Sequence, residues 1–203
     1  PTNAPGAGVV STLTLDSVLS GSGNVAFTSS VNQNALSTIY LGAQSTYTGS
    51  TLLDTDGTTA TQTILKLGIH NALPTTTVLT IDGPPGVSSG RFAELNLNGF
   101  NQQLAGLTNV AQSLRFQRVV NSNVSAAATL TINNTNTFTF SGILGAGADG
   151  SVSASSTPGS ANGNNFSLTK SGAGSFTLSG ANSYVGGTTI SGGKLIAQSS
   201  NTA

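Results

Sequence analysis

The chain has 203 residues, of which only 6% are charged, and its six basic and six acidic residues cancel. A nucleic-acid partner is not expected, because binding to phosphates needs a basic face. The absence of cysteine excludes disulfide bonds, thiolate metal sites and a cysteine nucleophile. With 36% hydrophobic residues and no net charge, the composition indicates a folded chain rather than a disordered one.

From the N-terminus, the chain is predicted to consist of a short arm and one long domain. Residues 1–9 predict a linker or an exchange arm, and residues 10–203 predict a single domain. Within it, residues 145–165 have low complexity and no apolar alternation, so they predict a flexible loop. No apolar run approaches the about 20 residues of a membrane span. The composition suits a secreted or cell-surface bacterial protein, and the start of the chain carries no signal sequence, so we expect an export signal to have been removed.

Runs in which polar and apolar residues alternate predict short β-strands. Turn signals rich in Gly, Asn and Pro separate these runs. No window shows a sustained helical period, so the chain is predicted to be all-β. The predicted strands are residues 10–15, 24–27, 38–41, 63–67, 77–81, 93–97, 103–107, 113–116, 129–132, 138–140, 175–178, 188–190 and 194–197.

An internal repeat suggests how these strands are arranged. Residues 41–53 align with residues 178–190 at a constant offset, which matches Tyr47 with Tyr184 and Thr51 with Thr188. Upstream of each copy, residues 21–27 and residues 172–178 share a pattern in which alternate positions are glycine and then apolar. Internal repeats of short strands are typical of solenoids.

The strands and the repeat together predict a parallel β-helix (β-solenoid) with protruding loops. Alternate Leu, Ile, Val and Phe side chains would fill a narrow interior, and Thr, Ser and Asn would face solvent. At roughly 20–25 residues per coil, about eight to ten coils would stack. A β-sandwich is the alternative, since it also consists of short strands with frequent turns.

The run from Lys170 to Leu195 resembles the autotransporter-associated β-strand repeat, and residues 39–57 resemble a degenerate copy with Ser45 where Asn is usual. The resemblance implies a right-handed parallel β-helix in the passenger of a secreted or surface-displayed bacterial protein. It implies no particular activity, because such passengers carry unrelated functions. The matching positions are Lys170, Gly172, Gly174, Phe176, Leu178, Gly180, Asn182, Tyr184, Gly186, Thr188, Ile190, Gly193 and Leu195.

The ionisable residues do not form the patterns that catalysis requires, so we do not expect an enzyme. The six acidic residues are spread along the chain, and only Asp54 and Asp56 are close. These two resemble the opening of a calcium loop, but no distal Glu follows, so they are a weak calcium candidate and no other cofactor is expected. The single histidine, His70, is expected to lie in a loop, without a catalytic triad.

We therefore expect a structural solenoid that forms a stalk, fibre or surface layer, by head-to-tail stacking into a homo-oligomer or homopolymer. A host or glycan surface is a further possible partner, which makes an adhesin or glycan-binding passenger module the alternative. Lesser alternatives are an ice-binding threonine face and a polysaccharide-degrading β-helix enzyme. The residues expected to mediate self-association are Val10, Thr12, Leu13, Leu15, Leu195 and Ile196.

Overall fold

The computed structural model describes residues 10–29, 36–55, 62–82, 92–110, 116–145 and 164–198. These residues form strands joined by turns, and none of them is helical. Every pairing between the strands is parallel. The fold is a parallel β-solenoid, and the alternative of a β-sandwich is wrong, because the sheets of a sandwich are antiparallel.

The predicted arm at residues 1–9 lies outside the described residues, as do residues 146–163 of the predicted loop. The strands are β1 (Val10–Leu15), β2 (Val25–Ser29), β3 (Leu36–Leu41), β4 (Thr51–Thr55), β5 (Gln62–Leu67), β6 (Val78–Ile81), β7 (Phe92–Asn96), β8 (Gln102–Leu104), β9 (Gly106–Asn109), β10 (Phe116–Val120), β11 (Ala128–Asn133), β12 (Phe138–Phe140), β13 (Ile143–Leu144), β14 (Phe166–Ser171), β15 (Ser175–Leu178), β16 (Thr188–Ile190) and β17 (Lys194–Ala197).

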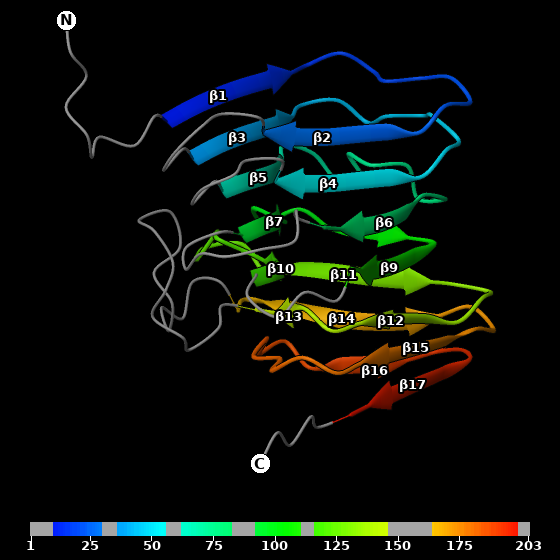
Figure 1. Ribbon diagram of the computed structural model, residues 1–203. Helices are drawn as coiled ribbons and strands as arrows, with labels where there is room; N and C mark the ends of the chain where they lie inside the picture. The colour runs from blue at the N-terminus through cyan, green and yellow to red at the C-terminus, as the bar shows by residue number, and fades with distance from the viewer. Residues whose placement is uncertain are drawn as a thin grey trace, which may run out of the picture.

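The strands stack into four sheets around one axis, with β1 and β17 at opposite ends of the stack (Figure 1). Sheet A has the order β1-β3-β5-β7-β10-β13, sheet B β2-β4-β6-β9, sheet C β16-β14-β11-β8 and sheet D β12-β15-β17. One coil runs through β7 in sheet A, β8 in sheet C and β9 in sheet B, and then returns to β10 beside β7. Sheet D continues the face of sheet B, because the ring of Phe138 in β12 lies against Gly106 in β9.

The register of the ladders gives the coil length. Ser11 lies beside Ser37, 26 residues later, whereas Glu94 lies beside Arg118, 24 residues later. Thr129 and Ser167 are 38 residues apart, because the chain between them includes residues 146–163. Most coils are therefore longer than predicted, and the longest sheet in the described part has six strands rather than eight to ten. Irregular corners account for the extra residues.

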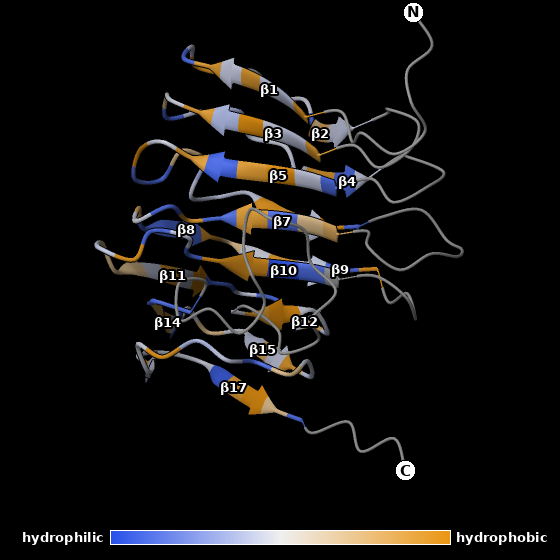
Figure 2. Cartoon of the chain, turned by 90° about the vertical axis from the view of Figure 1, so that its left-hand side faces the viewer, coloured by the Kyte–Doolittle hydropathy of each residue, from blue (hydrophilic) through white to orange (hydrophobic). Residues whose placement is uncertain are grey.

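Alternate residues of each strand point toward the axis and form one continuous core. Burial alternates along β4, β11 and β14, as the sequence pattern predicts. Leu53 in sheet B, Leu65 in sheet A and Leu130 in sheet C are fully buried in this core, as is Phe176 in sheet D. Figure 2 shows sheet A from outside, with strands of mixed hydropathy one above another. Among the described residues, no helix has the length and apolar character needed to cross a membrane.

Candidate functional site

Two corners of the solenoid, residues 42–50 (corner 1) and residues 179–187 (corner 2), share a pattern of backbone hydrogen bonds. In each corner, three successive backbone N–H groups donate to carbonyls of the preceding coil. The donor–acceptor distances agree pair by pair, so the two segments share this hydrogen-bonding pattern. The matched bonds are Thr46 to Leu19 and Ser183 to Leu144 (2.8 Å each), Tyr47 to Leu19 and Tyr184 to Leu144 (3.2 Å each), and Thr48 to Gly21 and Val185 to Asn164 (2.9 Å each).

A side-chain hydrogen bond closes both corners. The hydroxyls of Tyr47 and Thr51 are 2.5 Å apart, and the hydroxyls of Tyr184 and Thr188 are also 2.5 Å apart. In each case the threonine begins the strand that follows the corner, β4 or β16. The alignment of residues 41–53 with residues 178–190 therefore identifies a real structural unit: a strand, a corner tied by tyrosine and threonine, and a second strand.

The two corners lie on different faces of the solenoid. Corner 1 joins β3 of sheet A to β4 of sheet B, so it takes the place of a strand in sheet C. Corner 2 joins β15 of sheet D to β16 of sheet C, and it lies beside β13 of sheet A through its bonds to Leu144. The second copy of the unit is thus displaced by one face around the solenoid axis relative to the first. The two copies therefore do not stack in register.

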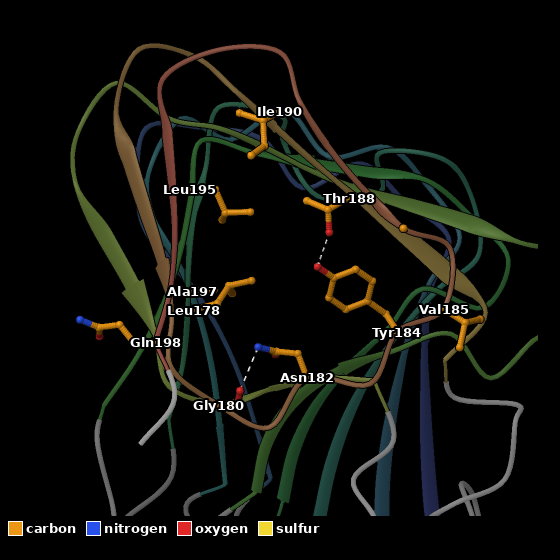
Figure 3. A pocket seen from close by; sticks show the side chains of 11 residues that line it. Leu178, Gly180, Asn182, Tyr184, Val185, Thr188, Ile190, Leu195, Ala197 and Gln198 are labelled. Carbon is orange, nitrogen blue, oxygen red and sulfur yellow. Dashed lines mark hydrogen bonds between the residues drawn. The ribbon is translucent and has the colours of Figure 1, made fainter. Parts of the chain in front are cut away.

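Corner 1 is covered by the next coil, whereas corner 2 faces a hollow at the C-terminal end of the stack. Tyr47 is buried, but Tyr184 is only partly buried and Thr188 is exposed. The hollow has a volume of about 830 Å³. Figure 3 shows Tyr184 and Thr188 pointing into it from one side and Leu195 from the other. We call the residues that line it the C-terminal end surface; they are Leu178, Gly180, Asn182, Tyr184, Val185, Gly187, Thr188, Ile190, Leu195, Ala197 and Gln198.

Lys170, on β14, is a buried cation in the coil before the last one. Its side chain points into the interior, where its Nζ donates to the carbonyl oxygens of Ser171 at 2.5 Å, Gly172 at 3.0 Å and Gly192 at 3.3 Å. Burial lowers the pKa of this ammonium group, because desolvation disfavours its charged form. The three carbonyls come from two successive turns, so Lys170 ties the last coil to the one before it.

Corner 2 and Lys170 lie in a segment that matches a known family. Residues 168–197 match the model of the passenger-associated-transport-repeat family. The match confirms the resemblance to an autotransporter passenger repeat, and we call this segment the passenger repeat. It contains corner 2, Lys170 and the last two strands of the solenoid. Comparison with the curated proteins and with the solved structures found no match to the chain.

A passenger repeat in a parallel β-solenoid fits a passenger of a secreted or surface bacterial protein. The hydroxyls, amides and aliphatic side chains that line the hollow include no carboxylate or imidazole. The end surface is therefore suited to packing and hydrogen bonding rather than to general acid–base chemistry.

The two copies of the corner allow a matched test of the tyrosine hydroxyl. We expect Tyr47→Phe to lower the free energy of unfolding by about 1 kcal/mol, because it removes a buried hydrogen bond. Tyr184→Phe removes the equivalent bond at corner 2, where Tyr184 is only partly buried, and we expect less than about half that effect. Urea unfolding followed by circular dichroism measures both changes. Equal losses in the two variants would contradict the role of the covering coil.

The stability that Tyr47 contributes depends on pH. Burial raises the pKa of Tyr47, so the folded state favours the protonated phenol. The unfolded tyrosine ionises near pH 10, and the stability from this group is lost as the pH rises above that value. Tyr47→Phe should therefore flatten the decline in stability between about pH 9.5 and 11.

A buried ion pair lies on the outer side of sheet A, away from the passenger repeat. The Nε and Nη2 atoms of Arg118 both lie 2.7 Å from Oε2 of Glu94, and the Nδ2 of Asn96 donates to Oε1 of Glu94 at 3.0 Å. The guanidinium stacks over the ring of Phe92 at 4.1 Å. Both charged side chains are almost completely buried. Because each charge is met by its partner, we interpret the cluster as structural.

The predicted chemical residues do not come together. Asp54 lies on β4, and Asp56 lies outside the described residues. Across the described ranges, no three His, Cys, Asp or Glu side chains are grouped for a metal ion, and calcium binding stays an untested prediction. His70 lies in a turn, where its Nδ1 accepts a hydrogen bond from the N–H of Asn101 at 2.9 Å and its ring meets Phe100 edge-on.

The residues predicted for self-association lie on the two end strands, β1 and β17. Leu13, Leu15 and Leu195 occupy inward positions, because their register partners lie in the core, and they contribute to the two end faces. Val10, Thr12 and Ile196 alternate with them, so their side chains point outward and only their backbones belong to the end edges.

The threonine face named as an ice-binding alternative would need a long, regular array, but the described strands carry only short threonine columns. On the outer side of sheet C, Thr131, Thr169 and Thr189 are successive register partners. On sheet A, the column that starts at Thr12 and Thr38 continues with Ile64. A regular threonine surface therefore does not extend over the described face of the solenoid, and the ice-binding alternative has no wider array to rest on.

Proposed function

We propose that the chain is a structural stalk module in the passenger of a secreted or surface-displayed bacterial protein. The observation that carries this proposal is the unbroken parallel ladder of sheet A, with one apolar core beneath it from end to end. Each coil is fixed to the next by ladder hydrogen bonds and by inward packing, which makes a rod stiff along its axis. The passenger repeat supports the surface location.

End-to-end association into a filament is the second part of the proposal. Large apolar side chains are exposed at both ends: Leu13 is 53% exposed at the N-terminal end, and Ile190 is 56% exposed at the C-terminal end. Among the described strands, only the face of sheets B and D presents a regular edge strand at both ends, β2 and β17. We therefore propose that β17 of one copy pairs with β2 of the next, which gives an open, head-to-tail polymer.

Antibody labelling of intact cells that produce the chain from its own gene tests the stalk. We expect the antibody to label the cell surface, and labelling that requires permeabilised cells would contradict the surface location.

Sedimentation velocity over a range of concentrations, with electron microscopy, tests the filament. We expect concentration-dependent species that Ile190→Lys abolishes and that Val124→Lys, at a similarly exposed position in the middle of the stack, leaves intact. Discrete monomers at every concentration would contradict the filament alone.

The adhesin alternative and the polysaccharide-degrading alternative have no support from the described residues. Most of the loop predicted to contact a host or glycan, residues 146–163, lies outside them. Glycoside hydrolysis needs two facing carboxyl groups, and the buried carboxylate of Glu94 is paired with Arg118. Both alternatives stay predictions from the sequence.

A further inference from the structure

Corner 1 shows how a following segment of the chain covers this type of corner. In corner 1, the N–H of Ser45 donates to the carbonyl of Ala72 at 2.9 Å, and Thr51 Oγ1 lies 2.9 Å from Thr77 Oγ1. Strand β4 then pairs in parallel with β6, so that Thr51, Leu52 and Leu53 meet Leu79, Thr80 and Ile81. A carbonyl, a hydroxyl and two inward apolar side chains of residues 71–81 thus complete corner 1.

Corner 2 presents the same groups without such a cover among the described residues. Asn182 occupies the position of Ser45, Thr188 that of Thr51, and Ile190 that of Leu53. Ser45, Thr51 and Leu53 are buried, whereas the three equivalent residues are exposed. Ile190 and Thr188 point toward the axis, because their register partners Lys170 and Leu168 are buried there. Their exposure is therefore not due to an outward orientation.

The equivalence continues beyond the corners. The N–H of Gly68 donates to Leu41 O, and the N–H of Gln198 donates to Leu178 O, both at 2.8 Å. Gln198 therefore stands where residue 68 stands, immediately before the segment that covers corner 1. The position below corner 2 has the shape and the hydrogen-bonding groups that residues 71–81 satisfy in the first copy.

We propose that the C-terminal end surface binds an extended polypeptide segment with the chemistry of residues 71–81, added as a strand parallel to β16. The segment supplies a backbone carbonyl to the N–H of Asn182 and a threonine or serine hydroxyl to Thr188 Oγ1. Apolar side chains at alternate positions after that hydroxyl fill the hollow against Tyr184, Ile190 and Leu195 (Figure 3). Backbone bonds give affinity in such strand addition, and the hydroxyl and apolar positions give specificity.

This binding goes beyond the filament proposed above, because the partner is an extended segment and not a folded second copy. The test is fluorescence anisotropy of a labelled synthetic peptide with the sequence of residues 69–81, titrated with the whole chain. We expect saturable binding that Ile190→Lys weakens at least tenfold, since a charge replaces an apolar contact in the hollow. Thr188→Val is expected to weaken it about three- to tenfold by removing one hydrogen bond. Val124→Lys, in the middle of the stack, should bind the peptide as the unchanged chain does.

Two peptide controls test the chemistry of the partner. A peptide with the same composition in scrambled order should not bind, and a peptide with valine in place of the threonine equivalent to Thr77 should bind about three- to tenfold more weakly. Equal binding of the scrambled peptide, or binding unaffected by Ile190→Lys, would overturn the proposal, as would the absence of binding at millimolar protein. Sedimentation of the chain alone tests the filament separately, so failure of one does not imply failure of the other.

Discussion

Arg118→Met is expected to lower the free energy of unfolding by about 3–5 kcal/mol. The substitution removes the two N–H groups of Arg118 that contact Glu94, a fully buried side chain that also accepts a hydrogen bond from the amide of Asn96. A carboxylate held out of water without its cation is strongly destabilising, and the lost stacking on Phe92 adds to this effect. Urea unfolding followed by circular dichroism gives the change.

The double variant Glu94→Gln/Arg118→Met separates the charge from the packing. With both charges of the pair removed, we expect it to recover more than about half of the loss, because replacing both members of a buried pair is far milder than removing one. Lys66→Met is the matched control, since Lys66 lies on the same outer side of sheet A without being fully buried, and should change stability by less than about 0.5 kcal/mol. A single variant no less stable than the double variant would contradict this account of the pair.

Gly174→Ala is expected to destabilise the last coils by about 2–3 kcal/mol. A Cβ at this position would lie 2.1 Å from the carbonyl oxygen of Asn136 and 2.7 Å from the backbone of Thr135, in the preceding coil. Both neighbours are backbone, so relief requires the coils to separate. That movement would disturb the hydrogen bonds from Gly174 N to Asn134 O and from Lys194 N to Gly174 O.

Gly23 provides the matched control for Gly174, because the two glycines occupy the same position in the aligned patterns of residues 21–27 and 172–178. A Cβ on Gly23 meets nothing within 4 Å. Gly23→Ala should therefore change the free energy of unfolding by less than about 0.5 kcal/mol. If urea unfolding gave the same loss for both variants, conformational freedom rather than the close approach between coils would explain the effect.

The class of fold was predictable because every inward position of a strand such as β11 is apolar and every outward one is polar. A narrow interior tolerates little else, so period-two alternation is a direct signal of it. The matched Tyr47 and Tyr184 also predicted a common local structure, which their hydrogen bonds confirm. That the two copies lie on different faces was not predictable, because the coils between them differ in length.

Charged residues inside strands account for two of the differences between the predicted and observed strands. Strand β14 was not predicted, since Lys170 occupies an inward position that alternation assigns to an apolar residue, and backbone carbonyls compensate its charge. A strand was predicted over residues 113–116, but β10 is Phe116–Val120 and has Arg118 at its centre. Glu94 and Arg118 are separated by one coil of 24 residues, so their pairing becomes visible only when the register is known.

The length of the coil sets how such a module occupies space. A coil of 26 residues advances the stack by only about 4.8 Å, whereas the same residues as an α-helix would span about 39 Å. The residues of each coil therefore add to the circumference of the solenoid rather than to its length. Every step along the axis presents a full circuit of side chains. A passenger built this way gains reach only in whole coils, and each added coil exposes far more lateral surface than length.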